Sequence, residues 1–142
     1  MRKNIRFNLK KVAIEQFAIL ADFAPDNKEA VQLQTSIAFK ANGNSHLVAC
    51  EAGFVFENGG QPFMKLAMMC HFEVEPNDWA SLIQDNGIVV IPKGFLCHLA
   101  MLTIGTARGI LFSKTENTDF NRYLIPLINV EKIVTEDFTV KE

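Results

Sequence analysis

Residues 46–74 read HLVACEAGFVFENGGQPFMKLAMMCHFEV and decide the fold, because apolar and mixed positions alternate through two runs, 46–57 and 62–74. One side of the two runs is apolar and comprises Val48, Cys50, Ala52, Phe54, Phe56, Met64, Leu66, Met68, Cys70, Phe72 and Val74. The other side carries polar and charged residues such as Glu51, Lys65 and His71. Between the runs, Asn58-Gly59-Gly60 is a tight-turn sequence. This pattern is typical of antiparallel strands whose sheet is covered on one face.

Two earlier runs, near 12–22 and 30–41, extend the predicted sheet to four strands. Turn residues at Asp26-Asn27 and Asn42-Gly43-Asn44 delimit the run 30–41. The run 12–22 does not choose a face, because Phe17 and Ile19 fall on one side of a regular strand and Val12 and Ile14 on the other.

A long helix follows the predicted sheet. Pro76-Asn77-Asp78 opens a short helical turn through Leu82, and residues 88–91 form a brief extended run before Pro92. From Pro92 to about Ser113 only Gly105 and Gly109 interrupt good helix formers, which predicts a helix roughly 33 Å long. A polar loop, an extended segment at 122–127 and a short amphipathic helix from Asn129 complete the chain. We therefore expect a single α+β domain, 1–142: a four-stranded antiparallel sheet, a long helix and a short C-terminal helix.

The long helix carries more apolar residues than one sheet can cover. We expect the remainder to pack against another copy of the chain, as a dimer or tetramer. The expected interface comprises Leu99, Leu102, Gly105, Arg108, Gly109 and Phe112. The alternative is that the two glycines make room for a strand or loop of the same chain. Arg108 is the only charged residue between Lys93 and Lys114. It either emerges through a gap in the packing or pairs with a carboxylate at an interface, and we favour structural pairing over a functional role.

Composition restricts the partners. The formal net charge of -2 makes nucleic acid an unexpected partner. The chain lacks a secretory h-region and a stretch of about 18 apolar residues, so we expect no membrane insertion. Three cysteines, an odd number within apolar stretches, indicate reduced thiols and a cytoplasmic protein.

No residue pattern indicates catalysis, a metal site or a cofactor. The pairs Cys70-His71 and Cys97-His98 are adjacent residues, whose side chains diverge on a strand or a helix, so neither pair suits one metal ion. No serine lies in a nucleophile-elbow sequence, and the cysteines lie in apolar surroundings that raise a thiol pKa. We therefore expect a binding protein rather than an enzyme.

Three segments resemble the SecB family of export chaperones. The sequence MLTIGTAR at 101–108 resembles the family's long-helix motif, in which an apolar run, a helix-disturbing residue and Ala-Arg follow one another. The sequence IPLIN at 125–129 is similar to the family's Ala-Pro-x-Asn, which precedes an amphipathic helix, and Lys65 to Val74 loosely resembles its Cys-Glu strand. With the order of strands and helices, the resemblance covers Val12 to Val134.

The resemblance implies an ATP-independent chaperone, a dimer of dimers, that holds unfolded polypeptide in apolar grooves and passes it to the SecA motor during protein export. By region, it places client binding at Phe23, Phe120, Tyr123 and Ile133.

The chain also departs from the family. The first connection, near Phe23 to Glu29, is shorter than the family's crossover loop, the C-terminal residues lack a Cys-and-His zinc-binding tail, and the chain is less acidic. Hand-off to SecA is therefore doubtful, and a dedicated client such as an antitoxin is an alternative. Two other hypotheses for the function are a structural or adaptor oligomer without general client binding, and a hot-dog-like enzyme such as a thioester hydrolase. The enzyme reading is disfavoured because hot-dog folds place their long helix before most strands.

Overall fold

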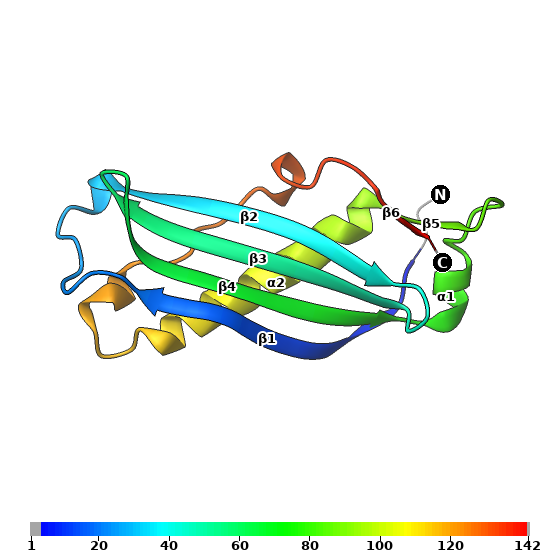
Figure 1. Ribbon diagram of the computed structural model, residues 1–142, viewed down its shortest axis with the longest axis horizontal. Coiled ribbons are helices and arrows are strands. Elements are labelled where there is room, and N and C mark those ends of the chain that lie inside the picture. The colour runs from blue at the N-terminus through cyan, green and yellow to red at the C-terminus, as the bar shows by residue number, and fades with distance from the viewer. Residues whose placement is uncertain (1–3, 142) are drawn as a thin grey trace.

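The computed structural model describes residues 4–141. Its main sheet has four antiparallel strands, β1 (Phe7–Ile19), β2 (Val31–Asn42), β3 (Leu47–Asn58) and β4 (Gln61–Val74), in the order β1-β4-β3-β2 (Figure 1). The predicted sheet is confirmed, with β2, β3 and β4 within one residue of the expected bounds. Because β1 and β2 lie at opposite edges, residues 20–30 must carry the chain across the end of the sheet, and this crossover is longer than the expected connection.

Two bulges in β1 explain why its sequence shows no regular alternation. Its register with β4 shifts between Leu9 and Lys11 and again between Ile14 and Gln16, which leaves Lys10 and Glu15 as the extra residues. Each bulge reverses the alternation, so Val12, Ile14, Phe17 and Ile19 all pair with residues of the buried face of β4. The interpretation that this strand chooses no face is wrong, because it assumed an unbroken period of two; the strand also begins at Phe7 rather than near residue 12.

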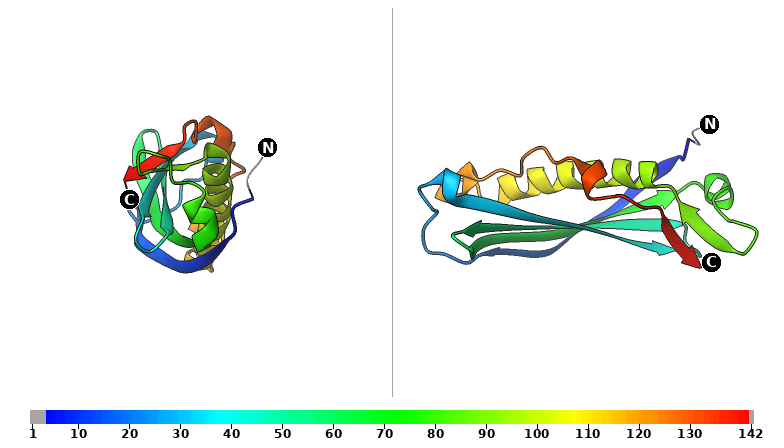
Figure 2. Two further views of the ribbon diagram at one scale, coloured as in Figure 1. Left: turned by 90° about the vertical axis from the view of Figure 1, so that its right-hand side faces the viewer. Right: turned by 90° about the horizontal axis from the view of Figure 1, so that it is seen from above.

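One long helix covers the inner face of the sheet. Helix α2 (Lys93–Lys114) runs diagonally across β3 and β4 (Figures 1 and 2). The core between them includes Val48, Cys50, Ala52, Phe54, Met64, Leu66, Met68, Phe72, Leu96, Leu99, Ala100, Ile104, Ala107 and Leu111. By length and hydropathy α2 could also cross a membrane, but its buried stripe packs on the sheet as in a core helix.

The remaining helices and strands are short. Helix α1 (Pro76–Ala80) precedes β5 (Ile88–Ile91), and the 3-10 helices are η1 (Lys28–Ala30), η2 (Asp119–Arg122) and η3 (Val130–Lys132). The expected C-terminal helix is only the single 3-10 turn η3. It is followed by β6 (Phe138–Lys141), which pairs with β5. The sequence did not indicate β6 because four residues are too short a run to show a period; its pairing with β5 makes it a strand.

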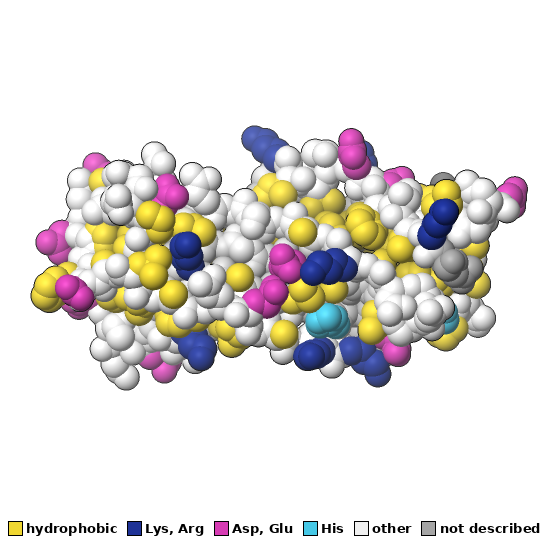
Figure 3. All heavy atoms as spheres, in the orientation of Figure 1, with side chains coloured by type: hydrophobic (Ala, Val, Ile, Leu, Met, Phe, Trp, Pro, Cys, Tyr) yellow, Lys and Arg dark blue, Asp and Glu magenta, His cyan; other side chains and the backbone are white. Residues whose placement is uncertain are grey.

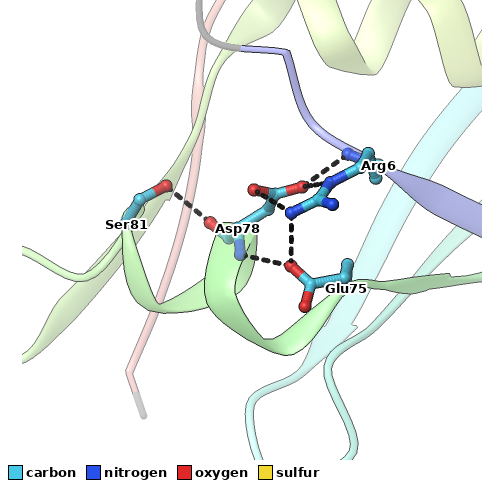
Figure 4. A network of polar contacts seen from close by, with 4 residues as sticks. All are labelled: Arg6, Glu75, Asp78 and Ser81. Carbon is cyan, nitrogen blue, oxygen red and sulfur yellow. Dashed lines mark hydrogen bonds and ion pairs between the residues drawn. The ribbon is translucent and has the colours of Figure 1, made fainter.

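A polar network fastens β1 to the end of the sheet that carries α1 (Figure 4). The Arg6 guanidinium lies 3.0 Å from Asp78 Oδ2 and 3.2 Å from Glu75 Oε2. Glu75 caps α1 by accepting a hydrogen bond from Asp78 N. The hydrogen bond from Arg6 lowers the pKa of Asp78. This network is structural and lies outside the apolar surfaces described below.

Candidate binding surfaces

One exposed apolar surface lies beside α2, on the side of β1. Helix α2 contacts β3 and β4, and several inner-face residues of β1 remain exposed beside it. Leu9, Val12 and Ile14 face the same side as the core residues with which they pair, yet Leu9 is 52% exposed. We define the β1–α2 face as Leu9, Val12, Ile14, Ile19, Met101, Leu102 and Phe112, all of which are exposed.

The outer stripe of α2 is apolar and contains two open glycines. Met101, Leu102, Gly105, Gly109 and Phe112 are exposed and lie opposite the buried stripe of the helix. A Cβ atom added to Gly105 or Gly109 would meet no atom within 4 Å. The alternative that these glycines make room for a strand or loop of the same chain is therefore wrong for the described residues. Within residues 4–141 the stripe is thus left open at both glycines.

Only some of the expected interface residues lie on the outer stripe of α2. Leu102, Gly105, Gly109 and Phe112 lie on the outer stripe. Leu99 is fully buried against the sheet, so it is removed from the interface. Arg108 lies on the flank of α2 next to the C-terminal segment, where it donates hydrogen bonds to the carbonyl oxygens of Ile125 and Pro126, each at 2.8 Å. Its partners are thus backbone carbonyls and not the expected carboxylate, because the extended segment turns its carbonyls toward the helix.

A second apolar surface lies at the crossover end of the molecule. Phe23 is 82% exposed, while the adjacent Ala24 is buried. Leu20 is exposed in the same crossover, and Leu124 and Leu127 are exposed on the segment after α2. The sequence interpretation missed Leu124, although alternation with the buried Tyr123 and Ile125 signals it.

Two of the expected client-binding residues, Phe120 and Tyr123, lie beneath this second apolar surface and are not exposed on it. Phe120 and Tyr123 are buried, and both rings pack on Phe63, at 6.2 Å and 5.2 Å between centroids. The Tyr123 hydroxyl donates a hydrogen bond to the carbonyl oxygen of Pro25. These aromatic residues hold the crossover in place, and sequence alone does not distinguish an aromatic anchor from an exposed contact.

Ile133 lies apart from Phe23, next to a small groove between β2 and the C-terminal segment. The groove has a volume of about 240 Å³ and is lined by Ile37, Phe39, Leu96, Ile133 and residues 134–138. A larger open groove of about 1230 Å³ surrounds the N-terminal half of α2 and mixes apolar residues such as Phe95 with Lys93, His98 and Glu131. Among the expected client residues, only Phe23 and Ile133 therefore offer apolar side chains to solvent.

The titratable side chains of the core are poor nucleophiles. Burial raises the pKa of Cys50 to about 11, and burial also raises the pKa of Cys70. Within residues 4–141, no group of three or more His, Cys, Asp and Glu side chains is arranged to hold a metal ion. What these surfaces offer chemically is apolar contact.

One solved structure similar to this chain is the SecB-like chaperone Rv1957 of Mycobacterium tuberculosis, in complex with a ChAD peptide from the Rv1956 HigA1 antitoxin. The sequence identity is 10% and the TM-score 0.47, and the match covers 87% of this chain and 91% of that chain. No protein-family model matches the sequence, and no curated protein matches it. A similarity of this size carries no argument about function, so the function has to be inferred from the chain's own residues.

Proposed function

We propose that this chain is a chaperone-like protein that holds non-native polypeptide by apolar contact, without ATP. The observation that carries the proposal is Phe23, whose ring is 82% exposed on a crossover that is itself anchored through the buried Ala24 and the bonded carbonyl of Pro25. Leaving a Phe side chain in water rather than burying it forgoes about 1.5–3 kcal/mol. An apolar ring held out on a fixed support is suited to capture apolar segments of another chain.

The proposal also includes self-association through the β1–α2 face. This face combines the outer stripe of α2 with the exposed inner-face residues of β1, and Gly105 and Gly109 permit a close approach. A second copy is the proposed occupant because the inner face of β1 and the outer stripe of α2 both expose apolar residues on the helix side of the sheet, next to the core. Client capture is then left to the crossover end.

The first experiment is light scattering of a chemically unfolded test protein diluted from denaturant, with and without a stoichiometric amount of this protein and without ATP. We expect suppression of scattering. The double substitution Phe23→Ser with Leu127→Ser should weaken suppression severalfold, because both side chains are exposed and their loss leaves the core intact. Lys28→Ser is the matched control, since it changes an exposed residue of the same crossover without removing apolar surface. Unchanged scattering at several-fold excess of the wild-type protein would refute the proposal.

A second candidate, an adaptor oligomer without general client binding, is favoured by one observation. Phe120 and Tyr123, two of the aromatic residues expected to bind a client, are buried within the chain. A stable oligomer that leaves scattering unchanged would support this candidate over the chaperone.

A further inference from the structure

The two edges of the main sheet differ in their backbone. At one edge, β1 is broken by two bulges whose extra residues, Lys10 and Glu15, are charged. Bulges and charges are the features that keep an edge strand from pairing with another chain. At the other edge, β2 pairs with β3 in unbroken register from Val31 opposite Asn58 to Asn42 opposite Leu47. The edge of β2 is therefore regular where that of β1 is not.

The register shows which backbone groups of β2 face outward. Val74 N donates to His46 O at 2.8 Å, so the N–H of the next residue, Leu47, points toward β2. In β3, the backbone N–H and C=O groups of the odd-numbered residues point toward β2. There they bond to the even-numbered residues of β2. The odd-numbered residues Leu33, Thr35 and Ile37 therefore turn their N–H and C=O groups to the open edge. Within residues 4–141, no backbone hydrogen bond outside the ladder with β3 involves residues 32–41 of this strand.

The side chains along this edge suit an added strand. Leu33, Thr35 and Ile37 are half-buried on the inner face, and the outer face carries no charge before Lys40. The groove of about 240 Å³ at Ile37 and Phe39 lies beside the same face. Opposite β3, at the free edge of β2, no strand of the described residues lies beside the first half of β2, whereas β6 lies near its end (Figure 2).

We propose that an extended segment of the client polypeptide adds to the edge of β2 as a fifth, antiparallel strand, opposite Leu33 to Ile37. This inference rests on the proposed function and gives it a binding mode, in which backbone hydrogen bonds provide affinity for many sequences and apolar side chains occupy the inner face. The strand starts directly after the crossover that carries Phe23 and runs to the groove at Ile133, so it connects the two exposed residues of the expected client site. The space-filling view shows the outer face of the sheet, where apolar side chains lie among scattered Lys, Arg, Asp and Glu side chains (Figure 3).

A second copy is a poorer occupant of this edge than a single extended chain. Two copies paired through antiparallel β2 strands would each bring residues 133–138 and β6, which flank the end of β2, against the crossover of the other. A single unfolded segment carries no such neighbouring elements. The edge is thus matched to polypeptide without tertiary structure.

The geometry makes a specific prediction for a probe peptide. In an antiparallel addition, a residue opposite Leu33 or Thr35 has its side chain on the inner face and its own N–H directed at β2. For a fluorescein-labelled peptide of alternating valine and threonine, the valines take the apolar inner face. N-methylation of the valines should therefore lower the affinity roughly tenfold or more, whereas N-methylation of the threonines should leave it nearly unchanged.

Thr35→Pro tests the hydrogen bond between the outward N–H of Thr35 and the added strand, and Thr35→Val is its control. Proline is tolerated at an edge position whose N–H faces solvent, but it removes the donor that an added strand requires. Peptide affinity, measured by fluorescence anisotropy on the full chain, should fall about tenfold in Thr35→Pro and stay unchanged in Thr35→Val. Circular dichroism checks that both variants are folded.

The outcomes separate this inference from the proposed function. Equal affinity for the two methylated peptides, together with equal binding by the two Thr35 variants, overturns strand addition while suppression of scattering still supports the chaperone. A change in solution mass in Thr35→Pro, with peptide binding intact, assigns the edge to a second copy and also overturns the inference. If wild-type protein neither binds the peptide nor suppresses scattering, the proposed function fails as well.

Discussion

The hydroxyl of Tyr123 donates a hydrogen bond to the carbonyl oxygen of Pro25, across 98 positions of sequence. The same ring lies edge-on to Phe63, at 5.2 Å between centroids. This contact joins the segment after α2 to the crossover between β1 and β2, and Ala24 beside it is buried. One aromatic side chain therefore fixes the support from which Phe23 projects.

Tyr123→Phe tests this anchor. The substitution keeps the ring contacts but removes the hydroxyl, which leaves the Pro25 carbonyl without its donor and should lower the free energy of unfolding by about 1 kcal/mol. Amide exchange should accelerate within residues 20–30 and remain unchanged in β3. Urea unfolding and hydrogen exchange measure the two effects. Tyr123→Ala is the comparison, with a larger loss of about 3–5 kcal/mol because a buried ring is removed; a wild-type exchange pattern in Tyr123→Phe would contradict the anchor.

The position of a residue could be predicted from the sequence where the residues that determine it are close to it in sequence. The hairpin of β3 and β4 could be predicted because apolar residues occupy every second position from Val48 to Phe56 and again from Met64 to Val74. The face of β1 could not, because the bulges at Lys10 and Glu15 are defined only by the register with β4. The outward position of Gly109 could be predicted from the helical period alone. The burial of Phe120 and Tyr123 could not, because both rings pack on Phe63, which lies far away in sequence.

Gly109→Leu should act oppositely on the single chain and on its assembly. Glycine disfavours a helix interior by about 0.8–1.0 kcal/mol relative to alanine, and the added side chain meets no atom of its own chain, so the isolated fold should gain roughly that amount. A bulky side chain would nevertheless prevent close approach of a second copy to α2. We expect a lower solution mass by light scattering coupled to gel filtration, together with a folded chain.

Gly109→Ala and Lys114→Leu serve as controls for this effect. Alanine gives a similar helix preference with little bulk and should lower the mass less than leucine does. Lys114→Leu adds an apolar side chain at the last residue of the helix and should leave the assembly unchanged. An unaltered mass in Gly109→Leu would show that this stripe is not an interface between copies.

The network of Arg6 with Asp78 predicts a change of stability with acidity. Arg6 lowers the pKa of Asp78 in the folded chain, so the contribution of this carboxylate is present above its unfolded pKa of about 3.9 and is lost as the pH falls through the lower folded value. Wild-type protein should exceed Arg6→Gln in stability at pH 7, and the difference should shrink below about pH 4. Added salt should also reduce it, because the Arg6 side chain is largely exposed to solvent. Urea unfolding of both proteins at the two pH values makes the measurement, and a difference that is independent of pH would exclude an electrostatic origin.

The three cysteines should separate into one accessible and two protected thiols. Cys50 and Cys70 are buried beneath α2, and burial raises the pKa of both, that of Cys50 to about 11, so little thiolate forms at pH 8. Burial also raises the pKa of Cys97, but this thiol is only half-buried and lines the large groove at the N-terminal half of α2. A chromogenic disulfide reagent should therefore react first with Cys97, and Cys97→Ser should abolish the early phase while Cys70→Ser leaves it. Because the other two thiols become accessible only when α2 leaves the sheet, their slow phase should follow the unfolding equilibrium in urea; rapid labelling of Cys50 in native protein would show that the helix is not held over the sheet.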